Sequence, residues 1–372
     1  MPPKLDFQIF PRLGVADLEA LWRPLQARSD TDFFLSWDWI GTWLAELGSL
    51  PDVIAGRVDG QIVLLGALFP ASRRTRIGFR VSSLNLHNVG NPAKDVITLE
   101  YNGFLVDRRW AGKVEAEAFG FLLGAPPRHA CEIHLKNLNE RYEAIPGPPG
   151  ALRTVLWRKP SWRIDLAAIR QSGKSYIEQL SANTRQQIRR SMRLYEGTGP
   201  LTITRAPDVA TAFRFLDGLE VLHQKYWIAK GAPGAFSYPF FVGFNRRLIE
   251  TCYPRGLMEL VRISRGDEPI GYLYNLIQDG QVRAYQSGFL YEEDARLKPG
   301  LVSHCLCIQR HLEEGAVLYD FMAGENRYKA NLGKPGPSMS YVMLQRQTPV
   351  LQAERLLADA YRSLRRLMRP SK

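Results

Sequence analysis

The sequence predicts an α+β protein with two domains, each built on a mixed central sheet flanked by helices. The chain has 372 residues, which exceeds the roughly 250–300 residues at which one hydrophobic core stops growing. In the second half, a strand is followed by helices, antiparallel strands, a helix and another strand, without the strict alternation of a dinucleotide-binding fold. Residues 144–151, AIPGPPGA, are poor in helix and strand formers. We therefore expect domains at 1–155 and 160–348 and a C-terminal helix at 349–372.

The first domain is predicted to be a meander of strands flanked by helices. One helix is expected over residues 15–28, and Ser36 can cap a second. Apolar residues recur at helical spacing in this second helix: Trp39, Ile40, Trp43, Leu44 and Leu47. Alternating strands at 53–58 and 62–69 are joined by Asp59-Gly60, a hairpin signal. We expect the helical stripe to face the core.

The second domain is predicted to begin with the strand WRIDL and a helical stretch over residues 174–199, KSYIEQLSANTRQQIRRSMRLYEGTG, which carries a basic face. A long helix follows at 209–229, then a loop rich in glycine and proline and another helix ending near Cys252. Two strands and a hairpin turned at Asp279-Gly280 come next. A helix over 301–315 and the buried strand VLYDFM complete the domain.

Charge and cysteine usage narrow the functional classes. The net charge of +12 favours an anionic partner. The four cysteines, Cys131, Cys252, Cys305 and Cys307, lack the spacing of a zinc site or a disulfide framework, so no metal is expected. The chain shows neither a signal peptide nor an apolar stretch of membrane-spanning length, which predicts a cytoplasmic protein.

Several catalytic signatures are absent from the sequence. It contains none of the motifs GxxxxGK[ST], GxGxxG, HExxH and GxSxG. Their absence argues against nucleotide hydrolases, zinc proteases and serine hydrolases.

The first candidate site lies between the hairpin and the helix that follows it. A helix is expected to begin just after Pro299-Gly300, beside Arg296 and Lys298. Free amides of a first helical turn next to two cations suit a pyrophosphate. The same pattern is also compatible with an ordinary loop from strand to helix.

The second candidate site is YDFMAGENRYK, at the end of the last predicted strand of the domain. Asp320 or Glu325 can act as a general base on an acceptor amine, and Tyr328 can protonate a leaving thiolate. Lys329 can anchor the substrate or pair with Glu325. The alternative is an ion-paired strand end without catalytic function.

Two further segments supply candidate substrate contacts. His223, Trp227 and Phe236 flank a flexible aromatic loop, and His223 is a further catalytic candidate. Arg185, Arg189, Arg190 and Arg193 recur three or four residues apart and form one basic face, which is either a phosphate clamp or a solvated surface.

The C-terminal helix is predicted to be amphipathic. Its sequence spacing places Leu357, Leu364 and Leu367 on one side, opposite Arg362, Arg365, Arg366 and Arg369. Such a helix can lie on an anionic membrane, contact a synthase complex, or pack on its own domain.

These passages resemble the GNAT-like acetyltransferase domain of CelD/BcsL-type proteins, which are associated with cellulose and exopolysaccharide biosynthesis and distantly related to the FemAB aminoacyltransferases. The resemblance rests on FLSWDWIGTWLAELG, LSANTRQQIRRSMRLYEG, LHQKYWIAKGAPGAF, the hairpin through YQSGF, the KPG-helix passage and DFMAGENRYK. It implies tandem GNAT-like domains, the first of them degenerate, with acetyl-CoA or another acyl-CoA as donor.

The resemblance also implies roles for individual residues. The donor would contact Tyr285, Gln286, Ser287, Arg296, Lys298, Gly300 and Leu301. The acceptor would contact Arg185, Arg189, Trp227 and Phe236. One departure is that the family pattern [RQ]xxGx[GA] has become Arg296-Leu297-Lys298-Pro299-Gly300-Leu301, in which proline removes an amide donor.

Three functions follow as hypotheses. The first is an acyltransferase that moves an acyl group from CoA to an amine or hydroxyl of a sugar or small metabolite. The second is FemAB-like transfer from aminoacyl-tRNA, in which the basic helix binds RNA; nucleic acid is expected as a partner only in this case. The third is a non-catalytic accessory protein of polysaccharide synthesis.

Overall fold

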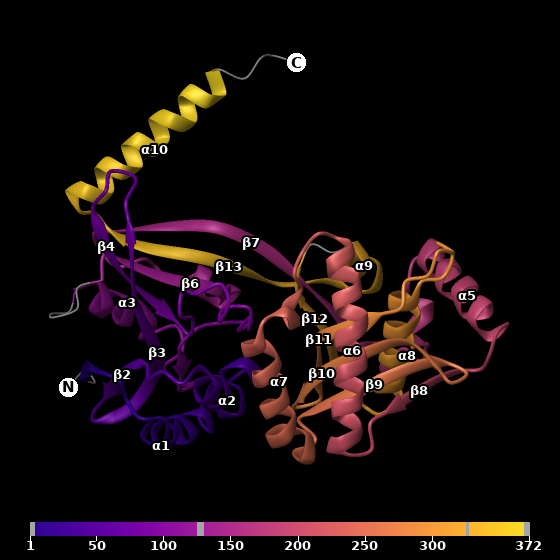
Figure 1. The fold of residues 1–372 in the computed structure, drawn as a ribbon. Helices are drawn as coiled ribbons and strands as arrows, with labels where there is room; N and C mark the ends of the chain where they lie inside the picture. Colours follow the sequence, from indigo (N-terminus) through magenta and orange to yellow (C-terminus); the bar gives the residue numbers. More distant parts are fainter. Residues whose placement is uncertain (1–3, 125–129, 325–326, 368–372) are drawn as a thin grey trace. The chain divides into compact units, whose positions relative to one another are not determined.

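The computed structural model describes residues 4–124, 130–324 and 327–367 (Figure 1). The chain forms two compact units. Unit 1 comprises Met1–Trp37, Gly48–Arg158 and Ser340–Lys372, and unit 2 comprises Asp38–Leu47 and Lys159–Met339. The units are therefore not consecutive halves: a helix from the first half belongs to unit 2, and the C-terminal segment belongs to unit 1. Sequence distance does not reveal this exchange, because it depends on which surfaces pack together.

Unit 1 is a mixed sheet with helices. Its strand order is β1-β2-β3-β4-β6-β13, and β5 pairs with β3. The elements are β1 (Leu5–Phe10), α1 (Val15–Gln26), β2 (Asp52–Val58), β3 (Gln61–Arg74), β4 (Arg80–Leu86), β5 (Leu105–Val106), α3 (Glu115–Gly124), β6 (Glu132–Asn139) and α10 (Pro349–Leu367). Asp59 and Gly60 both have positive φ between β2 and β3, which confirms the predicted hairpin turn.

Unit 2 is also a mixed sheet, with strand order β7-β12-β11-β10-β9-β8. Its helices are α2 (Trp37–Leu47), α4 (Leu166–Gln171), α5 (Ala182–Glu196), α6 (Val209–Ala229), α7 (Pro239–Cys252), α8 (Pro299–Glu313) and α9 (Arg327–Leu332). Its strands are β8 (Leu201–Arg205), β9 (Met258–Arg265), β10 (Glu268–Gln278), β11 (Gln281–Phe289) and β12 (Leu318–Ala323). The long strands β7 (Ala151–Asp165) and β13 (Lys334–Arg346) have residues in both units.

The two units repeat one order of elements. In unit 1, three antiparallel strands, β2 to β4, are followed by α3 and then by β6, which is parallel to β4. In unit 2, the antiparallel strands β9 to β11 are followed by α8 and then by β12, which is parallel to β11. This repetition confirms the predicted tandem arrangement of mixed sheets.

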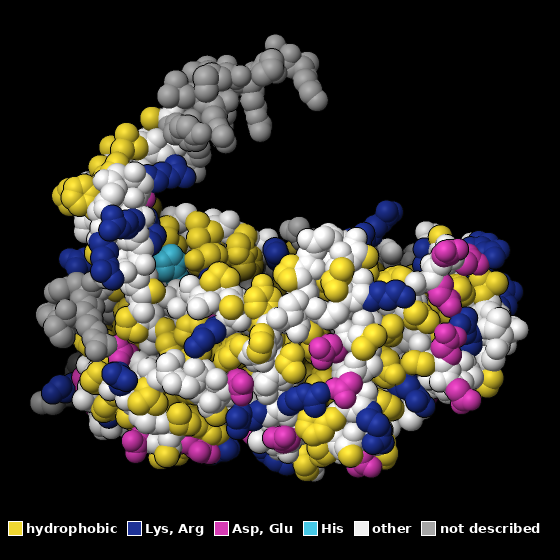
Figure 2. Space-filling view, in the orientation of Figure 1, with side chains coloured by type: hydrophobic (Ala, Val, Ile, Leu, Met, Phe, Trp, Pro, Cys, Tyr) yellow, Lys and Arg dark blue, Asp and Glu magenta, His cyan; other side chains and the backbone are white. Residues whose placement is uncertain are grey.

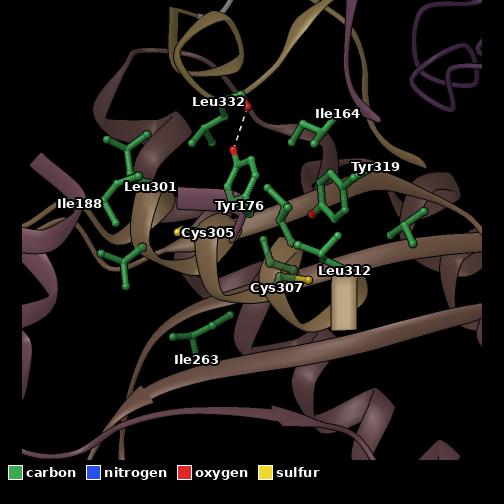
Figure 3. Close-up of a cluster of buried hydrophobic side chains, with 14 of the residues drawn as sticks. Ile164, Tyr176, Ile188, Ile263, Leu301, Cys305, Cys307, Leu312, Tyr319 and Leu332 are labelled. Carbon is green, nitrogen blue, oxygen red and sulfur yellow. Dashed lines mark hydrogen bonds between the residues drawn. The ribbon is translucent and has the colours of Figure 1, made fainter. Parts of the chain in front are cut away.

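The core of unit 2 lies between its sheet and the helices α4, α5 and α8 (Figure 3). Ile188 of α5, Cys305 of α8 and Tyr319 of β12 are among its buried side chains. The Tyr176 hydroxyl donates to the Leu332 carbonyl across 2.7 Å and ties the segment before α5 to α9 (Figure 3). Burial raises the pKa of Cys305 to about 12, so this thiol is protonated at neutral pH and packs as a small apolar group.

None of the described helices is both long enough and apolar enough to span a membrane.

Candidate functional site

The candidate site begins where two parallel strands of unit 2 part. β11 and β12 pair through only three residues each, Gln281–Arg283 with Leu318–Asp320. β11 continues to Phe289 and β12 to Ala323. Within the described parts of the chain their pairing thus stops early, and we call the place where the two strands part the unit 2 notch. Backbone groups that are not used in pairing, and side chains from α8 and α9, can meet there.

Four rings fill the unit 2 notch. The imidazole of His304, on α8, lies 5.7 Å from the Phe289 ring of β11 and 5.0 Å from the Phe321 ring of β12. The Tyr328 ring of α9 stacks on the other side of His304, with ring centres 5.7 Å apart and planes inclined by 12°. The side chain of His304 is only 1% exposed. The notch is therefore closed by aromatic packing around a buried imidazole.

His304 is neutral over the physiological range. Burial, together with the positive charge of Lys329, lowers its pKa to about 3. Its Nδ1 lies 3.2 Å from the hydroxyl of Tyr319, whereas its buried Nε2 has no hydrogen-bond partner among the described residues. A buried polar atom without a partner is uncommon in native proteins. His304 Nε2 is consequently available to a group that enters the notch.

Tyr328 supplies a phenol that stays protonated. Burial raises its pKa, and the neighbouring Tyr291 and Tyr226 raise it further. Those two tyrosines are more exposed and lie with ring centres 5.1 Å apart. A phenol in this state can give a proton to a leaving group but does not act as a base at neutral pH.

The other predicted catalytic residues of this segment hold the strand end together. Lys329 Nζ donates to the carbonyls of Phe321 and Ala323, at 2.6 and 2.8 Å. Asp320 is buried; its Oδ2 accepts from Arg163 Nε at 3.0 Å and its Oδ1 from the Met322 amide at 2.7 Å. Asp320 lies in register with Arg283, near the start of β11. Glu325 falls outside the described residues.

The N-terminus of α8 differs from the predicted pyrophosphate site in two respects. The amide of Lys298 donates to Ser191 Oγ on α5, at 2.9 Å. Arg296 forms an exposed ion pair with Asp294, with Nε 2.9 Å from both carboxylate oxygens. The first intrahelical bond runs from the Val302 amide to the Lys298 carbonyl, so the amides of Gly300 and Leu301 precede the helical ladder. Pro299 and the partner of Lys298 thus leave fewer donors than the resemblance implies.

The predicted donor strand carries a bulge. The register of β10 and β11 passes from Tyr274 opposite Gln286 to Asn275 opposite Ala284, which makes Tyr285 an extra residue. A bulge turns side chains out of the regular alternation. The Tyr285 ring lies 5.2 Å from that of Tyr274, while Gln286 and Ser287 are half-buried.

The third candidate group lies on α6 and in the segment that follows it. His223 lies between Trp227 and Phe236, with ring centres 6.0 and 5.1 Å away. Burial lowers the pKa of His223, and its Nδ1 lies 3.1 Å from the Gln224 side chain. Trp227 is 40% exposed, so it is the member of this group that presents a surface to solvent.

The basic face of α5 is confirmed. Arg189, Arg190 and Arg193 are exposed and Arg185 is half-buried, whereas Ile188 and Tyr195 are buried on the opposite side of the helix. A cavity of about 480 Å³ lies beside the start of α5. Its lining includes Arg163, Tyr176, Thr184, Asn331 and Lys334.

A buried cluster of Glu259, Cys307 and His311 has the composition of a metal site. Glu259 Oε1 already accepts from His311 and Asn275, at 2.7 and 2.8 Å. Its Oε2 accepts from Arg205 and Arg310, at 2.7 and 2.8 Å. Burial acts to raise the pKa of Glu259, but these bonds and charges lower it to about 2. A carboxylate with four donors, two of them guanidinium groups, forms a buried ion-pair network and is a poor ligand for a cation.

Comparison with known proteins identifies the domain that contains the unit 2 notch. Residues 182–330 match the family described as acetyltransferase (GNAT) domain. This match covers less than half of the chain. The matched region includes α5, the bulged strand β11, α8 and most of α9.

Solved structures share the fold of the chain. The crystal structure of FemX superposes with a TM-score of 0.55 at 10% identity, over 93% of this chain and 99% of that one. The structure of L-PGS from Bacillus licheniformis has a TM-score of 0.52 at 12% identity, over 94% of this chain and 97% of that one. No curated protein matches the sequence. At these identities the structures establish the GNAT-like fold, whereas the CelD/BcsL-type assignment is not confirmed.

Sequence reasoning missed three residues around the unit 2 notch: Tyr226, Tyr291 and His304. Tyr226 lies on α6 and Tyr291 follows β11, so only folding brings their rings together beside Tyr328. His304 carried a weak signal, because it is a titratable residue among the apolar positions of a helix. Its unpartnered Nε2 is visible only in the tertiary structure.

Proposed function

We propose that this protein is an acyltransferase whose reacting centre is the unit 2 notch, and that acetyl-CoA or another acyl-CoA is its first candidate donor. The acceptor is an amine or hydroxyl of a sugar or small metabolite. The observation that carries the proposal is the protonated phenol of Tyr328, whose ring packs against His304 and Phe321 where β11 and β12 part, within the region that matches the GNAT family.

The phenol has a defined task in acyl transfer. An acceptor amine attacks the acyl carbonyl, the new C–N bond forms and the C–S bond to the donor breaks. Tyr328 gives its proton to the departing thiolate, and the phenolate then takes the proton released by the new amide nitrogen. The cycle returns the phenol and yields an acylated acceptor and a free thiol.

The other residues of the notch support this step. Lys329 holds α9 to the end of β12 through two carbonyls, and so positions the adjacent Tyr328. The amides of Gly300 and Leu301, at the start of α8, can donate hydrogen bonds to an anionic group of the donor. His304 Nε2 can form a hydrogen bond with the donor once it enters between β11 and β12.

The test is calorimetric titration of acetyl-CoA and CoA into the full-length protein and its Lys298→Glu variant. Lys298 precedes α8, as Lys113 precedes α3 of unit 1, so Lys113→Glu is a matched control. Saturable binding that is weakened in Lys298→Glu and retained in Lys113→Glu supports the acyl-CoA donor. Absence of binding to the wild type rejects it.

A second candidate function, transfer from aminoacyl-tRNA, is favoured by the α8 terminus. Pro299 lacks an amide proton, the Lys298 amide is used by Ser191, and Arg296 is paired with Asp294. These features reduce the capacity for a pyrophosphate, while the exposed arginines of α5 suit RNA phosphates. Under this function, binding of tRNA weakens steeply with salt and with Arg189→Glu/Arg193→Glu, and acyl-CoA neither binds nor competes.

A further inference from the structure

The C-terminal helix α10 has two differently engaged parts. Leu351, in its first turn, is buried against unit 1. Glu354 meets Arg73 through two bonds, from Nη1 to Oε1 and from Nη2 to Oε2, each 2.9 Å long. Glu354 Oε1 also accepts from the Arg76 amide at 3.0 Å. The start of the helix is thus fixed to β3 and the turn that follows it.

The anchor is partly buried and joins one guanidinium to two carboxylates. Arg73 also pairs with the buried carboxylate of Glu132, with Nε 3.0 Å from Oε2. The hydrogen bond from Arg73 lowers the pKa of Glu354, so the pair remains ionised at neutral pH. Bidentate pairing between a guanidinium and a carboxylate also fixes direction. The base of α10 therefore has a defined orientation on unit 1.

Beyond this anchor the helix exposes apolar side chains. Leu356 is 68% exposed and Leu357 is 52% exposed. Figure 2 shows hydrophobic and basic side chains together on the described part of α10. Leu356 follows Glu354 by two positions and points to a different sector of the helix from Leu351 and Glu354, whereas Leu357 follows Glu354 by three positions and lies nearer the docked side, with half of its surface exposed. Leu356 therefore lies outside the surface by which α10 docks on unit 1.

The net positive charge of the chain from Glu354 to Lys372 indicates an anionic partner. From Glu354 onward the sequence contains Arg355, Arg362, Arg365, Arg366, Arg369 and Lys372, against the acidic residues Glu354 and Asp359. Glu354 is already neutralised by Arg73. Pairing with the same helix of a second copy would bring two arginine-rich segments together, which like-charge repulsion opposes. An anionic lipid surface satisfies both the leucines and the arginines.

We propose that α10 is an interfacial membrane-binding helix, which inserts Leu356 and Leu357 among anionic lipids while the Arg73–Glu354 pair holds it to unit 1. The residues of this helix belong to unit 1 and not to the unit 2 notch, so the proposal does not depend on the reaction proposed for the notch. The affinity has an apolar and an electrostatic component, so binding weakens as salt rises.

The test is co-sedimentation of the full-length protein with vesicles of phosphatidylcholine alone or mixed with phosphatidylglycerol. We expect binding to the mixed vesicles only. The double variant Leu356→Glu/Leu357→Glu should lower the bound fraction at least about tenfold, because two apolar contacts are lost. Val155→Glu/Leu156→Glu is a matched control: both side chains are 47% exposed and adjacent, but they lie on β7.

Three results would overturn the proposal. The first is failure of the wild type to bind mixed vesicles, and the second is an equal loss of binding in the α10 and β7 variants. The third is a wild-type dimer in light scattering that Leu356→Glu/Leu357→Glu converts to monomer, which would assign the leucines to a second copy. Thermal unfolding of both double variants checks that any loss reflects the surface and not the fold.

Discussion

The two units contain the same pair of parallel strands but fill the space beside them with different chemistry. In unit 1, β6 is parallel to β4 through three residues, and its Glu132 is bonded to Arg73, His134 and Gln345. In unit 2, β12 is parallel to β11 through three residues, and the place where the two strands part holds the rings of the unit 2 notch. Ion pairs surround Glu132 in the first unit, whereas in the second unit the Nε2 atom of His304 has no hydrogen-bond partner among the described residues.

The buried histidines show the same difference. In unit 1, His87 Nε2 accepts from the Ala67 amide and its Nδ1 bonds to Asn102, each at 3.0 Å. In unit 2, His304 bonds through Nδ1 alone. Both are neutral because burial lowers their pKa values, to about 4 and about 3. A satisfied buried histidine stabilises one arrangement, whereas an unsatisfied one leaves capacity for a ligand.

The helices that follow the antiparallel strands differ as well. Before α3, the Gly112 amide donates to the Glu115 carboxylate at 2.8 Å. This carboxylate would repel an anionic ligand from that helix start. Before α8 no carboxylate of the helix's own first turn takes such a role. The fold is thus duplicated, while the capacity to bind an anionic donor lies in unit 2.

The largest effect is expected from removing the ion-pair centre of unit 1. Glu132→Ala removes a buried carboxylate that accepts hydrogen bonds from Arg73 and Gln345, and we expect it to lower the free energy of unfolding by about 3 kcal/mol. Urea denaturation measures this change. The exposed pair of unit 2 is the control, since Asp294→Ala should have little effect. A Glu132→Ala midpoint equal to that of the wild type would contradict a structural role for this network.

Tyr328→Phe removes the proposed proton donor and keeps the ring. Since general acid catalysis contributes about 100-fold or more, we expect kcat to fall by at least about 100-fold with unfolding unchanged. Tyr341→Phe is the control in unit 1, because that hydroxyl bonds to His134 at 2.8 Å. Equal losses in both variants would show that the chemistry is not confined to unit 2.

Acidification should destabilise the folded protein through buried neutral histidines such as His87 and His304. The folded-state pKa of His304 is lowered to about 3, so its unfolded form gains a proton below about pH 6.5 while the folded form does not. Stability is therefore complete above that pH and falls below it, by about 2 kcal/mol per buried histidine at pH 5. His304→Phe should lose about 2 kcal/mol less than the wild type between pH 7 and pH 5 in urea titrations. An identical loss would place a proton on His304 in the folded protein.

The smallest effect is expected at the start of α8. Ser191→Ala removes the acceptor of the Lys298 amide, which should lower the free energy of unfolding by about 1 kcal/mol. In calorimetry, the released amide should tighten binding of any anionic donor at this helix. If Ser191→Ala weakens donor binding instead, the hydroxyl itself contacts the donor.

Local patterns in the sequence account for much of the fold. The turns at Asp59-Gly60 and Asp279-Gly280, the stripe of α2 and the two-sided α5 follow from short-range rules, and the structure confirms them. The aromatic group of His223, Trp227 and Phe236 was also predictable, because its members are close along one helix and the following loop.

The sequence by itself determined the secondary structure, the α+β class and the segments that carry functional residues, because these depend on neighbours along the chain. Only the tertiary structure decided which residues meet. It paired Asp320 with Arg163, bonded the Lys298 amide to Ser191 and surrounded His304 with Phe289, Phe321 and Tyr328. These partners lie on different elements, and their burial and hydrogen bonding depend on packing that no local pattern specifies.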